Sequence, residues 1–286
     1  MASRAALEDR VRTVVRIWVD AFAKHDLLTQ ASAIAFQVLK SLIPLSLLGI
    51  ALLGTVGRRD IWSRHIAPTI QSRLDPPVYH GIDYAVKKIF AHNSGPVLAF
   101  AAVLTIWYVS GAVRAIIGGI NRIYEAEETR PFWRRWPLSL GLSLCVVGGI
   151  VGAALLVEAV PTPRGAWEVP VVIARWLGAI LALSLVTGLL VRLGPVEHRP
   201  KKWASAGAVL VIATWVVTTL VFRWYIGLFA NFKTAIGQLT VFIVLMVYVY
   251  ASSIVFLVGV QLDELLREDA RADERGILHV LFGIRH

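Results

Sequence analysis

Long stretches without charged side chains dominate this chain. Three of them carry no charge at all, at residues 137–157, 203–222 and 235–262. Three others each hold a single cation, at residues 31–55, 95–120 and 169–191. At about 1.5 Å of rise per residue, helices of these lengths cross the roughly 30 Å hydrocarbon core of a bilayer. The pattern therefore predicts an all-α membrane protein, a bundle of six transmembrane helices within a domain at 31–266, with spans at about 31–55, 95–120, 137–160, 169–191, 203–228 and 235–262.

Two other parts of the chain place apolar residues at helical spacing. In the first connector, at 56–94, Trp62, Ile66 and Ile70 recur every fourth residue, and Ile82 and Val86 continue the pattern after a break at 75–77 that contains two prolines. We expect two amphipathic helices there, lying over the outer ends of the bundle. Residues 1–30 also have an apolar face, which predicts an amphipathic helix in the cytoplasmic interface.

The positive charges favour one orientation of the bundle. Loops rich in Lys and Arg remain in the cytoplasm. Cations gather before the first span, in the second and fourth connectors and in the tail at 267–286, whereas the third and fifth connectors hold only Arg164 and Lys233. Both termini are therefore predicted to be cytoplasmic. The segment at 56–94 is then extracytoplasmic, despite its own cations.

Composition bears on the class of protein and on its partners. With 57% hydrophobic and 17% charged residues, the chain has more apolar surface than one soluble core of this size buries. The formal net charge of +10 raises the question of nucleic acid, because basic patches bind phosphate. Here the cations flank predicted spans. We therefore expect membrane lipids with anionic headgroups as partners, and no nucleic acid.

Candidate catalytic groups are sparse. The seven histidines form no i,i+3 or i,i+4 pair, the single cysteine, Cys145, lies within a predicted span, and neither a P-loop nor a nucleophile elbow is present. We expect no metal, no cofactor and no enzymatic activity. Gly148 and Gly152 form a G-x-x-x-G pair, which predicts close helix packing or, as the alternative, a homodimer contact.

Polar residues at membrane depth are the remaining candidates for function. Lys40 lies about halfway along the first span, where a cation costs about 2.5–3.5 kcal/mol. Pro44 cannot donate to the carbonyl of Lys40, so a kink there would expose an acceptor beside the ammonium. One interpretation is a cavity lined by Gln37, Lys40 and Ser41 that receives a polar or anionic group. The alternative is a lysine that snorkels to the interface or pairs inside the bundle. Arg114 joins these candidates, although it also lies close enough to the headgroups to snorkel.

Several blocks resemble one known family. Ser41-Leu42-Ile43-Pro44 is similar to its S-L-x-P signature, and Asn121-Arg122-Ile123-Tyr124 to its L-N-x-x-[FY] block. The stretch from Pro200 through Asn231 to Gly237 resembles its most recognisable region. Over about residues 30–267 the chain resembles the YihY / virulence factor BrkB family of bacterial inner-membrane proteins, once labelled ribonuclease BN. The resemblance implies six helices in a bacterial plasma membrane, and its blocks add Asn121 and Asn231 to the candidate binding residues.

The chain also departs from the pattern of that family. Members usually have tyrosine and leucine where this chain has Gln37 and Lys40, and glutamate where it has Gln261. We therefore expect the chemistry of the cavity to differ from the family norm.

Two functions follow from these residues, and a third from the former label of the family. Lys40, the Pro44 kink and the cationic rim favour a transporter or flippase of an anionic lipid or small solute. The alternative is a non-catalytic membrane scaffold or envelope-integrity factor. A ribonuclease needs grouped carboxylates or histidines that hold a metal, or a paired acid and base, and the sequence groups none of these.

Overall fold

The computed structural model describes residues 20, 22–57, 59–72, 74–91, 94–159, 168–196, 213–215, 217–222, 224–225 and 235–271. In this part of the chain every regular element is a helix. Five helices are long and apolar enough to cross a membrane, namely α2 (Leu27–Thr55), α6 (Ser94–Ile123), α7 (Phe132–Ala159), α8 (Glu168–Leu193) and α10 (Ala235–Arg271). Of the predicted span at 203–228, the described residues form a shorter apolar helix, Ala213–Phe222. The count of six and the side on which each terminus lies stay predictions.

Several helix ends differ from the predicted spans. Helix α2 begins at Leu27, inside the segment predicted to lie in the interface. Helix α7 begins at Phe132, so Arg134 and Arg135 belong to its first turns and not to a connector, and α10 continues past Leu262 to Arg271. A charge-free window marks only the part of a helix that lies in hydrocarbon, whereas the backbone hydrogen bonds continue into the polar interface. Most of the predicted helix at 1–30, and the tail beyond Arg271, lie outside the described residues.

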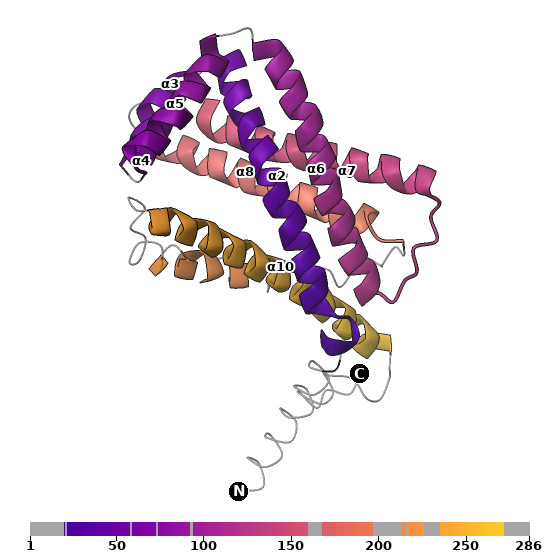
Figure 1. Ribbon diagram of the computed structural model, residues 1–286. Helices are drawn as coiled ribbons and strands as arrows, with labels where there is room; N and C mark the ends of the chain where they lie inside the picture. The colour runs from indigo at the N-terminus through magenta and orange to yellow at the C-terminus, as the bar shows by residue number, and fades with distance from the viewer. Residues whose placement is uncertain are drawn as a thin grey trace, which may run out of the picture.

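Helices α2 and α6 form the centre of the structure (Figure 1). They run side by side in opposite directions, and α10 packs against both of them. Helices α7 and α8 form a second pair, which runs across α2 and α6. We call the end that holds the start of α2 and the end of α6 the basal end. The opposite end carries the short helices that follow α2.

The apolar core lies where α2, α6 and α10 meet. Gly119 of α6 permits the close approach of α10, because a Cβ at this position would lie 3.0 Å from Cδ2 of Leu257. Protein interiors are packed too tightly to absorb such an atom without displacement of a neighbour. The residues of this core that are at most 1% exposed include Leu27, Ala31, Val113, Ile120, Ile123 and Leu257.

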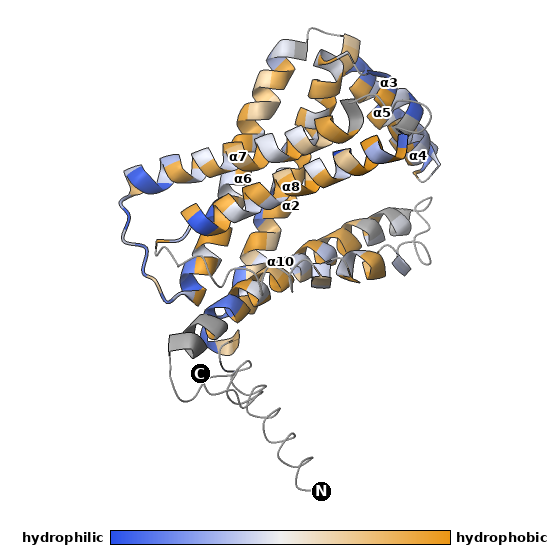
Figure 2. Ribbon diagram, turned by 180° about the vertical axis from the view of Figure 1, so that it is seen from behind, coloured by the Kyte–Doolittle hydropathy of each residue, from blue (hydrophilic) through white to orange (hydrophobic). Residues whose placement is uncertain are grey.

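The outer surfaces of the long helices are apolar. On α8, seven large side chains are more than half exposed, namely Val169, Ile173, Trp176, Leu177, Ile180, Leu181 and Leu185. Figure 2 shows hydrophobic residues along the long helices and hydrophilic residues at their ends and in the connectors. Apolar patches of this extent are rare on soluble monomers, and they suit contact with lipid.

A cap of short helices covers the end of α2 opposite the basal end. It consists of α3 (Arg59–Ile61), a π-helical turn (Trp62–Ile66), α4 (Ala67–Gln71) and α5 (Pro76–Ala91). The two apolar stripes of the sequence face one another, because Trp62 packs with Val86 and Phe90, and the same cluster rests on Ile50 and Leu53 of α2. The indole of Trp62 also donates to Asp83 at 3.0 Å. The helices of the cap therefore bury their apolar faces against each other and against α2.

Within the described residues, the G-x-x-x-G pair does not form the close helix contact that we expected. No atom of these residues lies within 4 Å of a Cβ built at Gly148 or Gly152. The close approach of α7 to α8 occurs at Gly149, where a Cβ would collide with Cγ2 of Val186. Successive residues of a helix point about 100° apart, so one step along α7 changes the face that meets α8. A homodimer contact at the open pair stays a prediction.

Candidate functional site

Three polar positions follow one another along the contact between α2 and α6. On α6 they are marked by Tyr108, Gly111 and Arg114, which are three residues apart and therefore share one helix face. Two of these positions meet a polar side chain of α2: Lys40 at Tyr108 and Gln37 at Gly111. We call Lys40, Gln37 and Arg114 the polar line.

The Lys40 side chain is exposed and lies between two aromatic rings. Its Nζ is 5.2 Å from the ring centroid of Phe36, one turn earlier on α2, and 5.5 Å from that of Tyr108 on α6. Both distances are within the range of cation–π attraction, which strengthens when water is excluded. The two rings stabilise the ammonium group, but they supply no negative charge that would pair with it.

Gln37 reaches α6 where that helix has no side chain. A Cβ at Gly111 would lie 3.0 Å from Oε1 of Gln37 and 3.9 Å from Nη2 of Arg114. The glycine therefore lets the amide of α2 approach α6 beside the guanidinium. Ser41 and Pro44 are both buried, and the hydroxyl of Ser41 donates to the carbonyl of Val38 in its own helix at 2.7 Å. Helix α2 continues through Pro44.

Arg114 lies within the span, about 14 Å from the basal end of α6 at 1.5 Å per residue. Its Nη1 donates to the hydroxyl of Ser110 at 3.0 Å and to that of Ser139 on α7 at 3.4 Å. Its guanidinium lies 5.5 Å from the ring centroid of Trp136. A small cavity beside it, lined also by Glu128, Arg130 and Arg135, has room for about one water molecule.

Asn121 holds the basal ends of α6, α7 and α8 together. Its Nδ2 donates to Oε2 of Glu128 at 3.1 Å, and its Oδ1 accepts from the backbone N–H of Val196 at 3.0 Å. Glu128 in turn accepts from Arg130 at 3.0 Å, and Arg130 donates to the carbonyl of Gly194 at 2.6 Å. This network fixes the wall of the cavity beside Arg114. Asn231 lies outside the described residues, so its place relative to this network stays a prediction.

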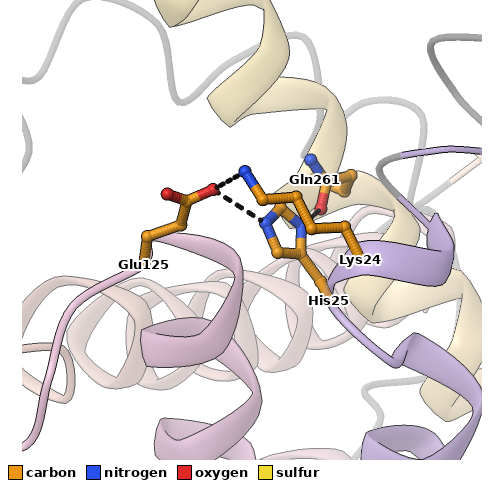
Figure 3. Close-up of polar contacts among 4 residues, drawn as sticks. All are labelled: Lys24, His25, Glu125 and Gln261. Atoms are coloured by element: carbon orange, nitrogen blue, oxygen red, sulfur yellow. Dashed lines mark hydrogen bonds and ion pairs between the residues drawn. The ribbon is translucent and has the colours of Figure 1, made fainter.

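A second polar group, which sequence reasoning missed, joins α2, α6 and α10 (Figure 3). We call Lys24, His25, Glu125 and Gln261 the basal cluster. Nδ1 of His25 lies 2.6 Å from Oε1 of Gln261, and its Nε2 lies 3.4 Å from Oε1 of Glu125. Lys24 forms an ion pair with the same carboxylate. His25 and Gln261 are 6% and 1% exposed, whereas the Glu125 side chain is 55% exposed.

The basal cluster has unusual backbone and electrostatic properties. The hydrogen bond from Lys24, and then that from His25, holds the pKa of the Glu125 carboxyl below its usual value. Asp26 and Glu125 both have φ of 52°, and they are the non-glycine residues with positive φ among those described. Nε2 of Gln261 is buried and has no hydrogen-bond partner in the described part of the chain. Helical spacing gave no signal for this cluster, because Glu125 and Gln261 lie 100 and 236 residues from His25 in the sequence.

No set of three His, Cys, Asp or Glu side chains lies together within the described residues.

Comparisons with known proteins place the chain in a family. The profile of a family described as virulence factor BrkB matches residues 18–279. The ribonuclease-like protein YfkH of Bacillus subtilis is 25% identical over 202 residues, which cover 66% of this chain and 72% of that protein. A UPF0761 membrane protein of Tolumonas auensis is 24% identical over 259 residues, which cover 88% of this chain and 83% of that protein.

Another relative is longer than this chain. A UPF0761 membrane protein of Stenotrophomonas maltophilia is 24% identical over 268 residues, or 89% of this chain, and the match spans 61% of that protein. No solved structure matches the chain. The family match covers most of the sequence, which confirms the resemblance, and the described helices include five that are long enough to cross a membrane. The chain belongs to the virulence factor BrkB family of membrane proteins.

Proposed function

We propose that the chain is a transporter or flippase of the bacterial plasma membrane that moves an anionic lipid or a small anionic solute. The observation that carries this proposal is the polar line, which follows the α2–α6 contact from mid-span toward the basal end. Polar side chains at membrane depth are costly and mark substrate pathways. The three side chains of the polar line follow one another along the contact between α2 and α6, and they offer successive positions for a negatively charged group.

The two cations of the polar line are stabilised without being neutralised. Aromatic rings hold Lys40, and hydroxyls and an indole hold Arg114. Within the described part of the chain, no carboxylate oxygen lies within 4.0 Å of either cationic group. Both charges therefore remain available to an anion. Phosphate suits this arrangement, because the fork of an arginine matches its oxygens.

We propose that the basal end lies in the cytoplasm. Arg122, Arg134 and Arg135 are exposed there, and loops rich in arginine remain inside. The cytoplasmic leaflet is also rich in anionic lipids. Because Arg130 and Arg135 line the cavity beside Arg114, a headgroup at the basal rim has Arg114 as its next cationic contact. The proposed partner therefore carries an anionic group that reaches Arg114 from the basal rim, it is not a nucleic acid, and the step involves no covalent chemistry.

Reconstitution tests this function. The purified chain in vesicles is compared with protein-free vesicles for the movement of fluorescent phosphatidylglycerol between leaflets, with fluorescent phosphatidylcholine as the zwitterionic comparison. Lys40→Ala and Arg114→Met are expected to slow the movement about 10- to 100-fold, because a hydrogen bond to a charged group contributes about 1.5–3 kcal/mol. Lys88→Ala is the matched control, since this cation lies over Tyr84 on α5, in the cap and away from the polar line.

The outcomes separate the parts of the proposal. Movement no faster than in protein-free vesicles contradicts the transport of this lipid, and uptake of inorganic phosphate then tests the small-solute form. Movement at the native rate in both variants contradicts a role for the polar line. Circular dichroism and gel filtration of each variant identify loss of folding.

A further inference from the structure

The basal cluster joins three helices through one buried imidazole. His25 lies at the turn that precedes α2, Glu125 follows the end of α6, and Gln261 lies on α10 (Figure 3). In Figure 3 the two nitrogens of the ring point to two different oxygens, one on each partner. The ring therefore links the basal ends of the three helices.

Both neighbours of the ring are hydrogen-bond acceptors. The ionised carboxylate of Glu125 accepts only, and the Gln261 atom that faces the ring is its amide oxygen. A neutral imidazole donates from one nitrogen, so with the Gln261 amide in this orientation one of the two contacts would place a lone pair against an oxygen. An imidazolium donates from both nitrogens. The short separation of 2.6 Å to Gln261 also suits a charge-assisted hydrogen bond to oxygen.

The backbone around the cluster is held in an unfavourable conformation. Asp26 follows His25 directly. Both Asp26 and Glu125 have the left-handed backbone conformation, which residues other than glycine rarely adopt. Such residues persist where surrounding contacts hold them, and they gather at functional and switching sites. Gln261 adds a buried amide nitrogen without a hydrogen-bond partner among the described residues.

We infer that His25 is a proton-binding site that locks the basal ends of α2, α6 and α10 together when its ring is charged, and releases them when its ring is neutral. The closed arrangement binds the proton, so lowering the pH shifts the population toward it. Histidine is the side chain that changes charge between about pH 5 and pH 8.

Besides Glu125, the elements that meet at the ring carry other ionisable groups, which include Lys24, Asp26 and Glu264. Lys24, on the same turn, pairs with Glu125, so that carboxylate faces two cations when the ring is charged. Asp26 is directed to its own helix, where it accepts from the hydroxyl of Thr29 at 3.0 Å. Glu264 lies one turn beyond Gln261 on α10 and is buried. Glu125 keeps its charge throughout the range in which histidine titrates, because its pairing with Lys24 lowers its pKa.

Hydrogen–deuterium exchange of the full chain in lipid nanodiscs tests the inference without any measurement of transport. Exchange is compared at about pH 5.5 and pH 8, after correction for the chemical rate. Peptides near 22–32, 118–127 and 255–266 are expected to lose protection about tenfold or more at the higher pH, the effect of one charge-assisted hydrogen bond. Peptides from the middle of α7 serve as the internal control. His25→Gln is expected to remove the pH response, whereas His80→Gln, at an exposed histidine on α5, retains it.

A second variant keeps the inference testable if His25→Gln does not fold. Gln261→Met retains the ring but removes the acceptor at Nδ1, so the closed arrangement requires more acid and the midpoint moves to lower pH. Equal protection of the native chain at both pH values would overturn the inference. An undiminished pH response in His25→Gln, or an unchanged midpoint in Gln261→Met, would do the same. Failure of the lipid assay leaves this test unaffected, because its readout is local opening.

Discussion

Replacement of Asn121 tests how the basal ends of three helices are held together. The residue is 5% exposed and uses both ends of its amide, toward Glu128 and toward the backbone of Val196. Asn121→Ala removes both hydrogen bonds. The bond to the charged carboxylate contributes about 1.5–3 kcal/mol and the neutral bond about 0.5–1.5 kcal/mol. The variant is therefore expected to lose about 2–4 kcal/mol of unfolding free energy.

A second replacement at this position separates the two bonds. Asn121→Asp retains an oxygen for the N–H of Val196, but it places a carboxylate where the amide nitrogen lies 3.1 Å from Glu128. Near neutral pH the two anions repel, so this variant is expected to be at least as unstable as Asn121→Ala. Its deficit is expected to shrink as the pH falls toward 4, where carboxylic acids bind protons.

The assay is reversible unfolding of the detergent-solubilised chain by sodium dodecyl sulfate, followed by far-ultraviolet circular dichroism. Glu127→Ala, at an exposed position of the same connector, is the control and is expected to change stability by less than about 0.5 kcal/mol. A loss below about 1 kcal/mol in Asn121→Ala would refute the reasoning, because it lies under the smallest sum of the two bonds. Native stability of Asn121→Asp at neutral pH would also refute it.

Two further predictions use the same unfolding measurement. Gly149→Ala is expected to cost about 1–3 kcal/mol, because its Cβ collides with the stiff side chain of Val186. Gly148→Ala meets no atom of the described residues within 4 Å and is expected to be neutral or stabilising, so equal effects of the two variants would contradict the assigned α7–α8 face. The hydrogen bonds from Lys24 and then His25 lower the pKa of Glu125, so the stability they contribute is present above the ordinary carboxyl value of 4.5 and is lost as the pH falls through the lowered value. In Glu125→Gln, the unfolding free energy is expected to decrease less steeply as the pH falls below 4.5. A decrease as steep as that of the native chain would show that the Glu125 carboxylate does not cause the loss of stability in acid.

The long helices were predictable because the bilayer restricts which residues fit. A cation within hydrocarbon is costly, so stretches without charge mark the spans closely. Helix α8, for example, runs from Glu168 to Leu193 where the sequence predicted 169–191. The face that a span presents to its neighbours was harder to predict, because apolar residues surround these helices on all sides. The helix contact at Gly149, one residue from the predicted pair, is the result of that ambiguity.

The candidate site was only partly predictable. Lys40, Gln37 and Arg114 were identifiable because each is polar within an apolar stretch. Their partners were not, since Tyr108 and Gly111 are ordinary span residues until α2 is packed against α6. Helical spacing also could not reveal the contact of His25 with Gln261, because 236 positions separate the two residues in the chain.

Helix α2 connects the basal cluster with the polar line. It contacts α6, α10 and the cap, it begins two residues after His25, and it carries Gln37 and Lys40 at mid-span. Packed helix contacts change between discrete arrangements and do not deform continuously, so release of the basal end is expected to shift Lys40 relative to Tyr108. If the two sites are coupled in this way, loading of the polar line by an anion must also alter proton binding at His25, because coupling between sites is reciprocal. Proton binding that is the same with and without a bound anionic lipid would show that α2 does not couple the two sites.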